Sequence, residues 1–588
     1  MPLYPRLHTQ LTEQEMIDGF GGYDHRLRIA DGAWFDTENL SSDLAPMLSV
    51  RRPRGNTHLR AAALLEKDAL AYVSEDGTLY YNFLPTAVTG LSAAPKQIVG
   101  MGAYLVIFPD KVYFNTADQT DRGSLEAHFA PQSAGYELCR FDGTALRADY
   151  IQPDEPDAPQ NAQYWIDTSG ESNVLRQWSG AQGDWVTVET AYVRIGFETR
   201  GVVPKLFSAG DGVTVSGSSL GEVNGEKLLA AVGGGGEESD WVILTALPAH
   251  LPDDPDTALR IDRSVPEPDF VCECQNRLWG CRYGLGEDGR PVNEIFCCAL
   301  GDFKNWKQFR GLATDSWVGS VGSDGQWTGA VNYLGSPTFF KENRIHRVGI
   351  SPEGAHTISE TVCRGVQKGS EKSLRVVNET LYYKSRSDVC AYQGGFPAGV
   401  SAELGAKSYH GAVAGEARGK YYLSMLDEDE TPSLFVYDIA KGLWLREDAL
   451  RVTDFARVDD ELYAIADGEL ITLFGSLPVA GSTREETVAW QAVSGILCYR
   501  YPENKRVSRY NIRLSLAQGA AMEVYVQYDS DGVWRSAGGI SAAKSMTDAC
   551  LFPVRPHRCD HLQLKLEGLG EVRIFSLARI LEVGSDYR

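Results

Sequence analysis

Several features are scarce in this 588-residue sequence, and each shortage removes a class of protein. No 18 apolar residues run together, and the first segment, "MPLYPRLHTQLTEQEMIDGF", has no apolar stretch, so neither membrane spanning nor secretion is indicated and folding in a cytoplasm is expected. Basic residues number 56 against 79 acidic ones, a net charge of -23. Such a surface repels nucleic acid and anionic lipid, which disfavours a general DNA binder.

The sequence also has few of the motifs that carry chemistry. No phosphate-binding loop of the form G-x-x-x-x-G-K-S/T is present, and "GGGG" at 233–236 is followed by no lysine, so it predicts a flexible loop. The eleven cysteines are odd in number and scattered, which favours reduced thiols. Their densest group lacks the paired C-x(2–4)-C spacing of a structural zinc site and predicts core packing: Cys272, Cys274, Cys281, Cys297 and Cys298. No metal and no cofactor are predicted.

Glycine and aromatic residues, by contrast, are plentiful. Sixty glycines, 27 tyrosines and 12 tryptophans accompany short alternating apolar runs that end at turns such as "EDG", "PDK" and "ADGE". Helical periodicity is nearly absent. The pattern predicts an all-β protein.

One hairpin pattern repeats along the chain. An aromatic strand, an acidic turn and a second strand recur, as in "KYYLSMLDEDETPSLFVYDIAKGLW" (420–444), and the leading aromatics Phe340, Tyr382, Tyr422 and Tyr463 lie about one blade length apart. With two earlier hairpins, "ALAYVSEDGTLYYN" and "AYLVIFPDKVYFN", the repeat predicts a β-propeller of six or seven blades.

Breaks in this repeat suggest the domain boundaries. The period is lost in the middle of the chain, which predicts an inserted β-rich module, and the last hundred residues alternate polar and apolar as in an antiparallel β-sandwich. The predicted parts follow in chain order: 1–56, an N-terminal arm; 57–129, the first blades; 130–255, the inserted module; 256–480, the remaining blades; and 481–588, the C-terminal β-sandwich.

Several stretches resemble a known family. They are the arm "FGGYDHRLRIADGAWFDTENLSSDLAPMLSVRRPRG", the segment "YWIDTS", and the tail with "YDSDGVW", "PVRPHRCDHLQLKLEG" and "GSDYR". They resemble the tail nozzle, or packaged-DNA stabilisation, proteins of short-tailed bacteriophages. The resemblance implies a non-enzymatic virion protein that forms a six-fold homo-oligomeric ring below the portal, extends the DNA channel and retains the genome until ejection.

Partners and location follow from the same resemblance. It implies contacts with a tail adaptor or portal-associated protein and with tail fibre or spike proteins, and transient, non-specific passage of double-stranded DNA. The protein would be assembled in the bacterial cytoplasm and reside in the phage tail, with no membrane anchoring.

Two charged segments are the candidate contact sites of this hypothesis. Arg51, Arg52 and Arg54 would pair with acidic groups of a neighbouring subunit or adaptor, and the alternative is an exposed turn whose charges lie in water. The hairpin tip Asp427, Glu428, Asp429 and Glu430 would face the channel and repel sliding DNA, or else would face solvent.

A glycan-binding or glycan-cleaving propeller tail protein is the alternative function. The nearest matches to the S-x-D-x-G-x-x-W turns of sialidases, "GSDGQW" and "YDSDGVW", have the wrong spacing, and no pair of acidic residues stands out as catalytic. Trp165, Trp178 and Trp185 of the inserted module would then form a sugar platform, although core packing is the simpler explanation. A cellular propeller scaffold with no viral role is a second alternative.

Overall fold

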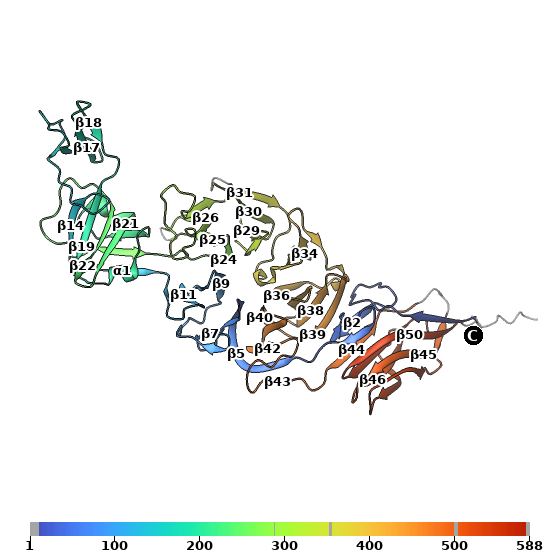
Figure 1. Cartoon of the computed structure of the whole chain (residues 1–588). Helices are drawn as coiled ribbons and strands as arrows, with labels where there is room; N and C mark the ends of the chain where they lie inside the picture. Colours follow the sequence, from blue (N-terminus) through green and yellow to red (C-terminus); the bar gives the residue numbers. More distant parts are fainter. Residues whose placement is uncertain (1–10, 287–288, 352–354, 499–503, 584–588) are drawn as a thin grey trace, which may run out of the picture.

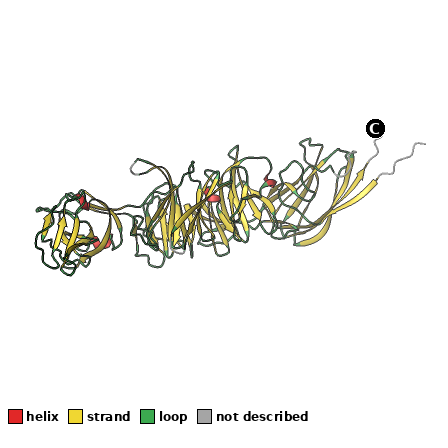
Figure 2. Ribbon diagram, turned by 90° about the horizontal axis from the view of Figure 1, so that it is seen from above, coloured by secondary structure: helices red, strands yellow, loops and turns green. Residues whose placement is uncertain are grey.

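The computed structural model describes residues 11–286, 289–351, 355–498 and 504–583, which form three β-rich parts in a row (Figures 1 and 2). A propeller lies in the middle, the inserted module extends from one side of it and a β-sandwich from the other. Within these residues the helices are single turns: α1 (Val203–Leu206), η1 (Gly221–Val223), η2 (Glu371–Ser373) and η3 (Ala402–Leu404). None of the described helices is long and apolar enough to cross a membrane. The predicted all-β fold class is confirmed.

Seven antiparallel blades form the propeller in the described part of the chain: five are separate four-stranded sheets, and the first and last blades are joined in one eight-stranded sheet. In chain order the first three are β5 (Gly55–Glu66), β6 (Leu70–Ser74), β7 (Leu79–Tyr81) and β8 (Leu84–Pro85); β9 (Gln97–Met101), β10 (Tyr104–Phe108), β11 (Val112–Asn115) and β12 (Arg122–Ser124); and β24 (Phe270–Cys274), β25 (Arg277–Leu285), β26 (Pro291–Cys297) and β27 (Trp317–Ser320).

The other four blades follow without a further large insertion. They are β28 (Gly329–Tyr333), β29 (Ser336–Lys341), β30 (Arg344–Ile350) and β31 (His356–Val362); β32 (Arg375–Val377), β33 (Thr380–Lys384), β34 (Val389–Tyr392) and β35 (Ala398–Gly399); β36 (Tyr409–Ala417), β37 (Lys420–Asp427), β38 (Pro432–Asp438) and β39 (Leu443–Asp448); and β40 (Val452–Val458), β41 (Glu461–Ala466) and β42 (Glu469–Thr472) with part of β5.

Strand β5 closes the ring because it belongs to two blades. Its first half pairs with β42, from Gly55 opposite Thr472 to Arg60 opposite Glu469, and its second half pairs with β6. Short β43 (Thr483–Arg484) pairs with its first half as well. Backbone hydrogen bonds of a single strand therefore join the first blade to the last.

The second strand of each blade explains the aromatic repeat. Phe340, Tyr382, Tyr422 and Tyr463 lie on β29, β33, β37 and β41, the second strands of four consecutive blades, and all four are buried. Each blade is covered by a neighbour on both faces, so its middle strands read as continuous apolar runs rather than alternating ones. The aromatic repeat in the sequence therefore arises because each blade packs against its neighbours on both faces.

The inserted module leaves the ring after β12 and returns before β24. Its entry strand β13 (Ala127–Phe129) pairs with its exit strand β23 (Arg260–Arg263), which holds the two ends together. The main sheet continues through β14 (Ala134–Cys139), β19 (Tyr192–Phe197), β20 (Gly212–Ser216), β21 (Gly225–Gly235) and β22 (Glu238–Thr245). A small outer sheet contains β15 (Tyr150–Gln152), β16 (Tyr164–Asp167), β17 (Val174–Ser179) and β18 (Asp184–Thr187).

The C-terminal sandwich includes strands from both ends of the described chain. One sheet contains β1 (Leu11–Ile17), β3 (Leu40–Ser41), β4 (Leu48–Val50), β45 (Lys505–Leu516), β48 (Met546–Pro553) and β50 (Val572–Val583). The other contains β2 (Trp34–Glu38), β44 (Ala489–Ser494), β46 (Ala521–Tyr528), β47 (Arg535–Ser541) and β49 (Leu562–Leu569). The predicted N-terminal arm, 1–56, therefore contributes strands to the sandwich and is not separate from it; its first ten residues lie outside the described residues.

Alternation along β45 builds the core of this sandwich. Tyr510, Ile512 and Leu514 are fully buried, whereas the intervening Asn511 and Arg513 are exposed. A strand with a period of two places all its apolar side chains on one face of a sheet. The second sheet covers that face.

Candidate functional site

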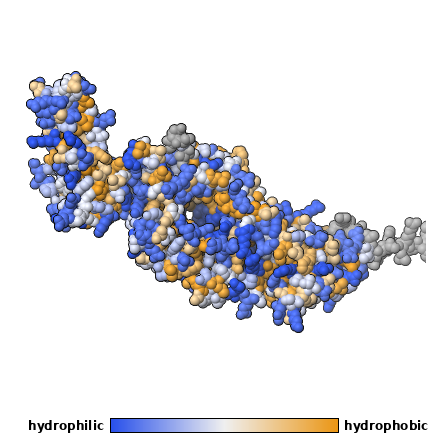
Figure 3. All heavy atoms as spheres, viewed as in Figure 1, coloured by the Kyte–Doolittle hydropathy of each residue, from blue (hydrophilic) through white to orange (hydrophobic). Residues whose placement is uncertain are grey.

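A cavity of about 840 Å³ lies on the axis of the propeller. Its walls come from the first strands of all seven blades, β5, β9, β24, β28, β32, β36 and β40. Figure 3 shows the molecule hollowed at the centre of the ring. A volume of this size matches the range of small-molecule sites in proteins, roughly 300–1,000 Å³.

Charged groups of both signs line this axial cavity. The acidic ones are Glu66, Asp68, Asp269, Glu371, Glu416 and Asp454, and the basic ones are Lys67, Lys96, Lys372, Arg375 and Arg457. Two ion pairs organise part of the wall: Arg457 Nη1 lies 2.5 Å from Glu416 Oε1, and Lys372 Nζ lies 3.1 Å from Asp454 Oδ2. A neighbouring cation stabilises the ionised form of a carboxylate.

Glu66 differs from these paired carboxylates. It is the last residue of β5, and its carboxyl makes no hydrogen bond or ion pair within the described residues. Desolvation in the cavity raises the pKa of Glu66; the Arg457 guanidinium opposes the rise and the Glu416 carboxylate adds to it. The carboxyl of Glu66 therefore holds its proton at a higher pH than an ordinary glutamic acid.

Strand geometry brings Glu66, Glu416 and Arg457 together. They lie near the ends of β5, β36 and β40, the first strands of three consecutive blades around the ring. Apolar side chains complete the wall beside them, including Leu64 and Phe455. The arrangement offers a carboxyl group with a raised pKa, an ion-paired carboxylate and an apolar surface at one place, which are the elements of acid-assisted cleavage of a glycosidic bond.

The predicted acidic tip lies away from this cavity. Asp427, Glu428, Asp429 and Glu430 form the turn between β37 and β38 and are not among the described residues that line the cavity. Asp427 Oδ1 accepts hydrogen bonds from the backbone nitrogens of Asp429 and Thr431, both 3.0 Å long. The turn uses its first carboxylate to fix its own backbone, and its remaining residues are exposed to solvent.

Two of the three predicted contact arginines are engaged inside the chain. Arg54 Nη2 lies 2.7 Å from Glu447 Oε2 and its Nη1 lies 2.5 Å from Asp448 Oδ2. Arg51 Nη1 lies 2.7 Å from Glu485 Oε2. Both arginines are buried, so they join the arm to the propeller instead of presenting charge to a second subunit; Arg52 alone is exposed.

The tryptophans of the inserted module pack against one another. Trp185 makes edge-to-face contacts with Trp165 and with Trp178, each with ring centroids 5.4 Å apart, and Trp165 and Trp185 are buried. They form the small core of the outer sheet rather than a flat sugar platform.

The five clustered cysteines are buried as well, and no group of three or more metal-ligating side chains is found in the described residues.

No family model and no curated protein matches the chain, but solved structures do. An exo-β-1,3-galactanase from Phanerochaete chrysosporium aligns at 7% identity over 52% of this chain and 94% of that chain, with a TM-score of 0.21. A family 43 arabinoxylan arabinofuranohydrolase from Bacillus subtilis aligns at 9% identity over 52% and 94%, with a TM-score of 0.14. A Trypanosoma rangeli sialidase aligns at 8% identity over 89% and 96%, with a TM-score of 0.19.

These findings correct the prediction of function. The matching structures are glycoside hydrolases and a sialidase, which contradicts the predicted function of a tail nozzle that is not an enzyme; the resemblance to bacteriophage proteins, the partners and the location stay predictions. The glycan-directed alternative is retained. At such identities and TM-scores the likeness concerns the fold alone, so the choice among functions rests on this chain's own residues.

No motif in the sequence pointed to the residues of the cavity. Glu66 lies hundreds of positions before Glu416 and Arg457, and each of the three lies at or next to the end of an ordinary strand. The one signal that could have indicated them was the hairpin repeat. The strand that precedes each aromatic second strand is the first strand of a blade, and it faces the axis of the propeller.

Proposed function

We propose that the protein is a glycan-cleaving propeller enzyme whose site is the axial cavity. The observation that carries this proposal is the raised pKa of Glu66 beside the ion-paired carboxylate of Glu416 in a cavity of about 840 Å³. Glycoside cleavage commonly uses two carboxyl groups with different protonation states, one an acid and the other an ionised carboxylate.

In the proposed reaction Glu66 donates its proton to the glycosidic oxygen as the bond to the anomeric carbon breaks. Glu416, which pairs with Arg457, stabilises the positive charge that develops at that carbon. Water supplies the hydroxyl group of the new reducing end, and its remaining proton restores Glu66. The apolar wall at Leu64 and Phe455 would lie against the sugar ring.

Release of reducing sugar from a panel of bacterial and plant polysaccharides tests the proposal. The wild-type protein should release reducing ends from at least one of them, and Glu66→Gln and Glu416→Gln should each lower kcat by roughly 100-fold or more, the usual size of acid catalysis. Glu428→Gln, on the exposed turn, is the matched control and should keep full activity.

Two outcomes would count against the proposal. Binding of a polysaccharide without release of reducing ends would leave a glycan-binding propeller. Activity that survives both cavity substitutions would place the chemistry elsewhere in the molecule.

A further inference from the structure

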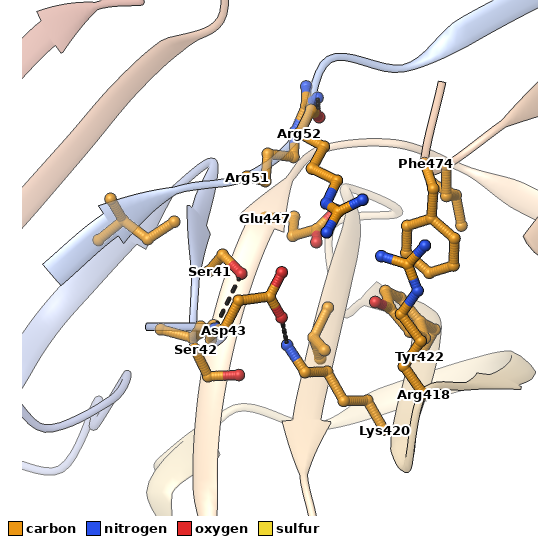
Figure 4. Close-up of a pocket in the computed structure, with 14 residues that line it drawn as sticks. Ser41, Ser42, Asp43, Arg51, Arg52, Arg418, Lys420, Tyr422, Glu447 and Phe474 are labelled. Carbon is orange, nitrogen blue, oxygen red and sulfur yellow. Dashed lines mark hydrogen bonds and ion pairs between the residues drawn. The ribbon is translucent and has the colours of Figure 1, made fainter. Parts of the chain in front are cut away.

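A second, smaller pocket lies where the arm meets the last two blades (Figure 4). The arm contributes Ser41, Asp43 and Arg52, and the turn between β36 and β37 contributes Arg418. The pocket is separate from the axial cavity, because the two share no lining residue.

Most charges around this junction pocket are already neutralised in pairs. Lys420 Nζ lies 2.5 Å from Asp43 Oδ1, and Glu447 pairs with Arg54. Arg51 pairs with Glu485 at 2.7 Å. Each carboxylate that faces the pocket thus already has a basic partner.

Arg52 and Arg418 remain without a carboxylate partner within the described residues. Figure 4 shows their guanidinium groups directed toward the same space. The Arg418 guanidinium carbon lies 3.8 Å from the ring centroid of Phe474, and its Nη2 donates a 3.4 Å hydrogen bond to the Asp460 carbonyl oxygen. These contacts fix the direction of the group without cancelling its charge.

A tyrosine hydroxyl lies in the same wall. Tyr422 is only 4% exposed, lines the pocket, and its hydroxyl makes no hydrogen bond within the described residues. Two cations and one free donor therefore border a single space.

The size of the pocket limits what it holds. Its volume of about 20 Å³ admits one small group rather than a sugar ring. A groove of about 510 Å³ adjoins it, sharing Asp43, Arg51 and Arg52, and runs between the arm and the sandwich past Arg573. A ligand could place one head group in the pocket and its remainder in the groove.

We propose that the junction pocket binds one oxyanion group, a carboxylate, sulfate or phosphate, between Arg52 and Arg418 with the Tyr422 hydroxyl as a third donor. Guanidinium groups present paired N–H donors that match the oxygens of such anions. The Asp43 carboxylate, which Lys420 already pairs, offsets part of the positive charge of Arg52 and Arg418, and a bound anion would lie between the two guanidinium groups. The site stands independently of glycan cleavage in the axial cavity.

Calorimetric titration of the whole chain in a Tris-chloride buffer of constant ionic strength tests the site, with sulfate, inorganic phosphate and glucuronate as separate probes. We expect saturable binding of at least one probe with one site per chain. Arg52→Ala and Arg418→Ala should each weaken it by about 10-fold or more, and Tyr422→Phe by a smaller factor. Preference for glucuronate would identify a carboxylate ligand, and preference for sulfate or phosphate a tetrahedral one.

Arg147→Ala is the control, since Arg147 is an exposed arginine of the inserted module. It should leave the affinity unchanged. Both pocket arginines are exposed at their side chains, so their variants should keep the wild-type circular dichroism spectrum and remain interpretable. Absence of saturable binding to the wild type, or equal affinity in the wild type and both arginine variants, would overturn the proposal.

Discussion

Arg54 is the residue whose loss should most clearly weaken the attachment of the arm to the propeller. Its guanidinium is 7% exposed and pairs with Glu447 and Asp448 at the end of β39. Arg54→Ala removes the cation and leaves both carboxylates at a largely buried site. Breaking a buried ion pair by removing one partner typically costs about 3–5 kcal/mol, and we take about 3 kcal/mol because Asp448 also lies 3.9 Å from Arg51.

That free energy converts into a shift of the melting temperature. A propeller of roughly 280 residues has an unfolding entropy of about 0.6 kcal/mol/K, so a loss of about 3 kcal/mol lowers its Tm by ~5 °C. Differential scanning calorimetry measures this, with Arg52→Ala as the control in the same loop, for which exposure predicts a change within about 0.5 kcal/mol. If Arg54→Ala melted within 1 °C of Arg52→Ala, the buried network would not hold the arm.

Two further predictions concern the propeller. Burial lowers the pKa of Lys384 to about 8, so between pH 8 and 10.5 the unfolded chain binds more protons than the folded one. The free energy of unfolding should therefore rise with pH across this range, by up to about 3 kcal/mol. Urea titrations at each pH measure the rise, and Lys384→Met should flatten it. A Cβ atom at Gly22 would lie 2.2 Å from the Trp444 carbonyl oxygen, so Gly22→Ala should destabilise the arm–propeller contact by about 2 kcal/mol and speed proteolysis of the arm, whereas Gly135→Ala, with open space around it, should do neither.

Local patterns in the sequence predicted most of the fold. The spacing of Phe340, Tyr382, Tyr422 and Tyr463 predicted the blades because every second strand is buried on both faces, and the alternation along β45 predicted the sandwich. Both signals can be recognised in the sequence because buried positions carry apolar or aromatic residues and exposed positions carry polar ones.

Pairings between distant segments were not predictable in this way. Strand β1 pairs with β50, and β5 pairs with β42, across most of the chain, and no local pattern encodes a partner so far away. The arginines of the arm show the consequence: Arg51 and Arg54 looked available for a partner because their acidic neighbours, Glu447 and Glu485, lie hundreds of residues further on.

The cavity residues were missed for the same reason, since Glu66 and Glu416 become neighbours only when the ring closes. The predicted ring-forming homo-oligomer, its partners and its location stay predictions, because they concern contacts outside a single chain.

Cleavage in water enriched in ¹⁸O tests the central claim most directly. With a labelled oligosaccharide from a polysaccharide that the protein acts on, hydrolysis in the axial cavity predicts mass spectra in which the new reducing end carries one ¹⁸O atom, and Glu66→Gln should abolish those products while the Glu428→Gln control retains them. An intact oligosaccharide mass after long incubation with the wild type, or labelled product formed equally by Glu66→Gln, would contradict the account.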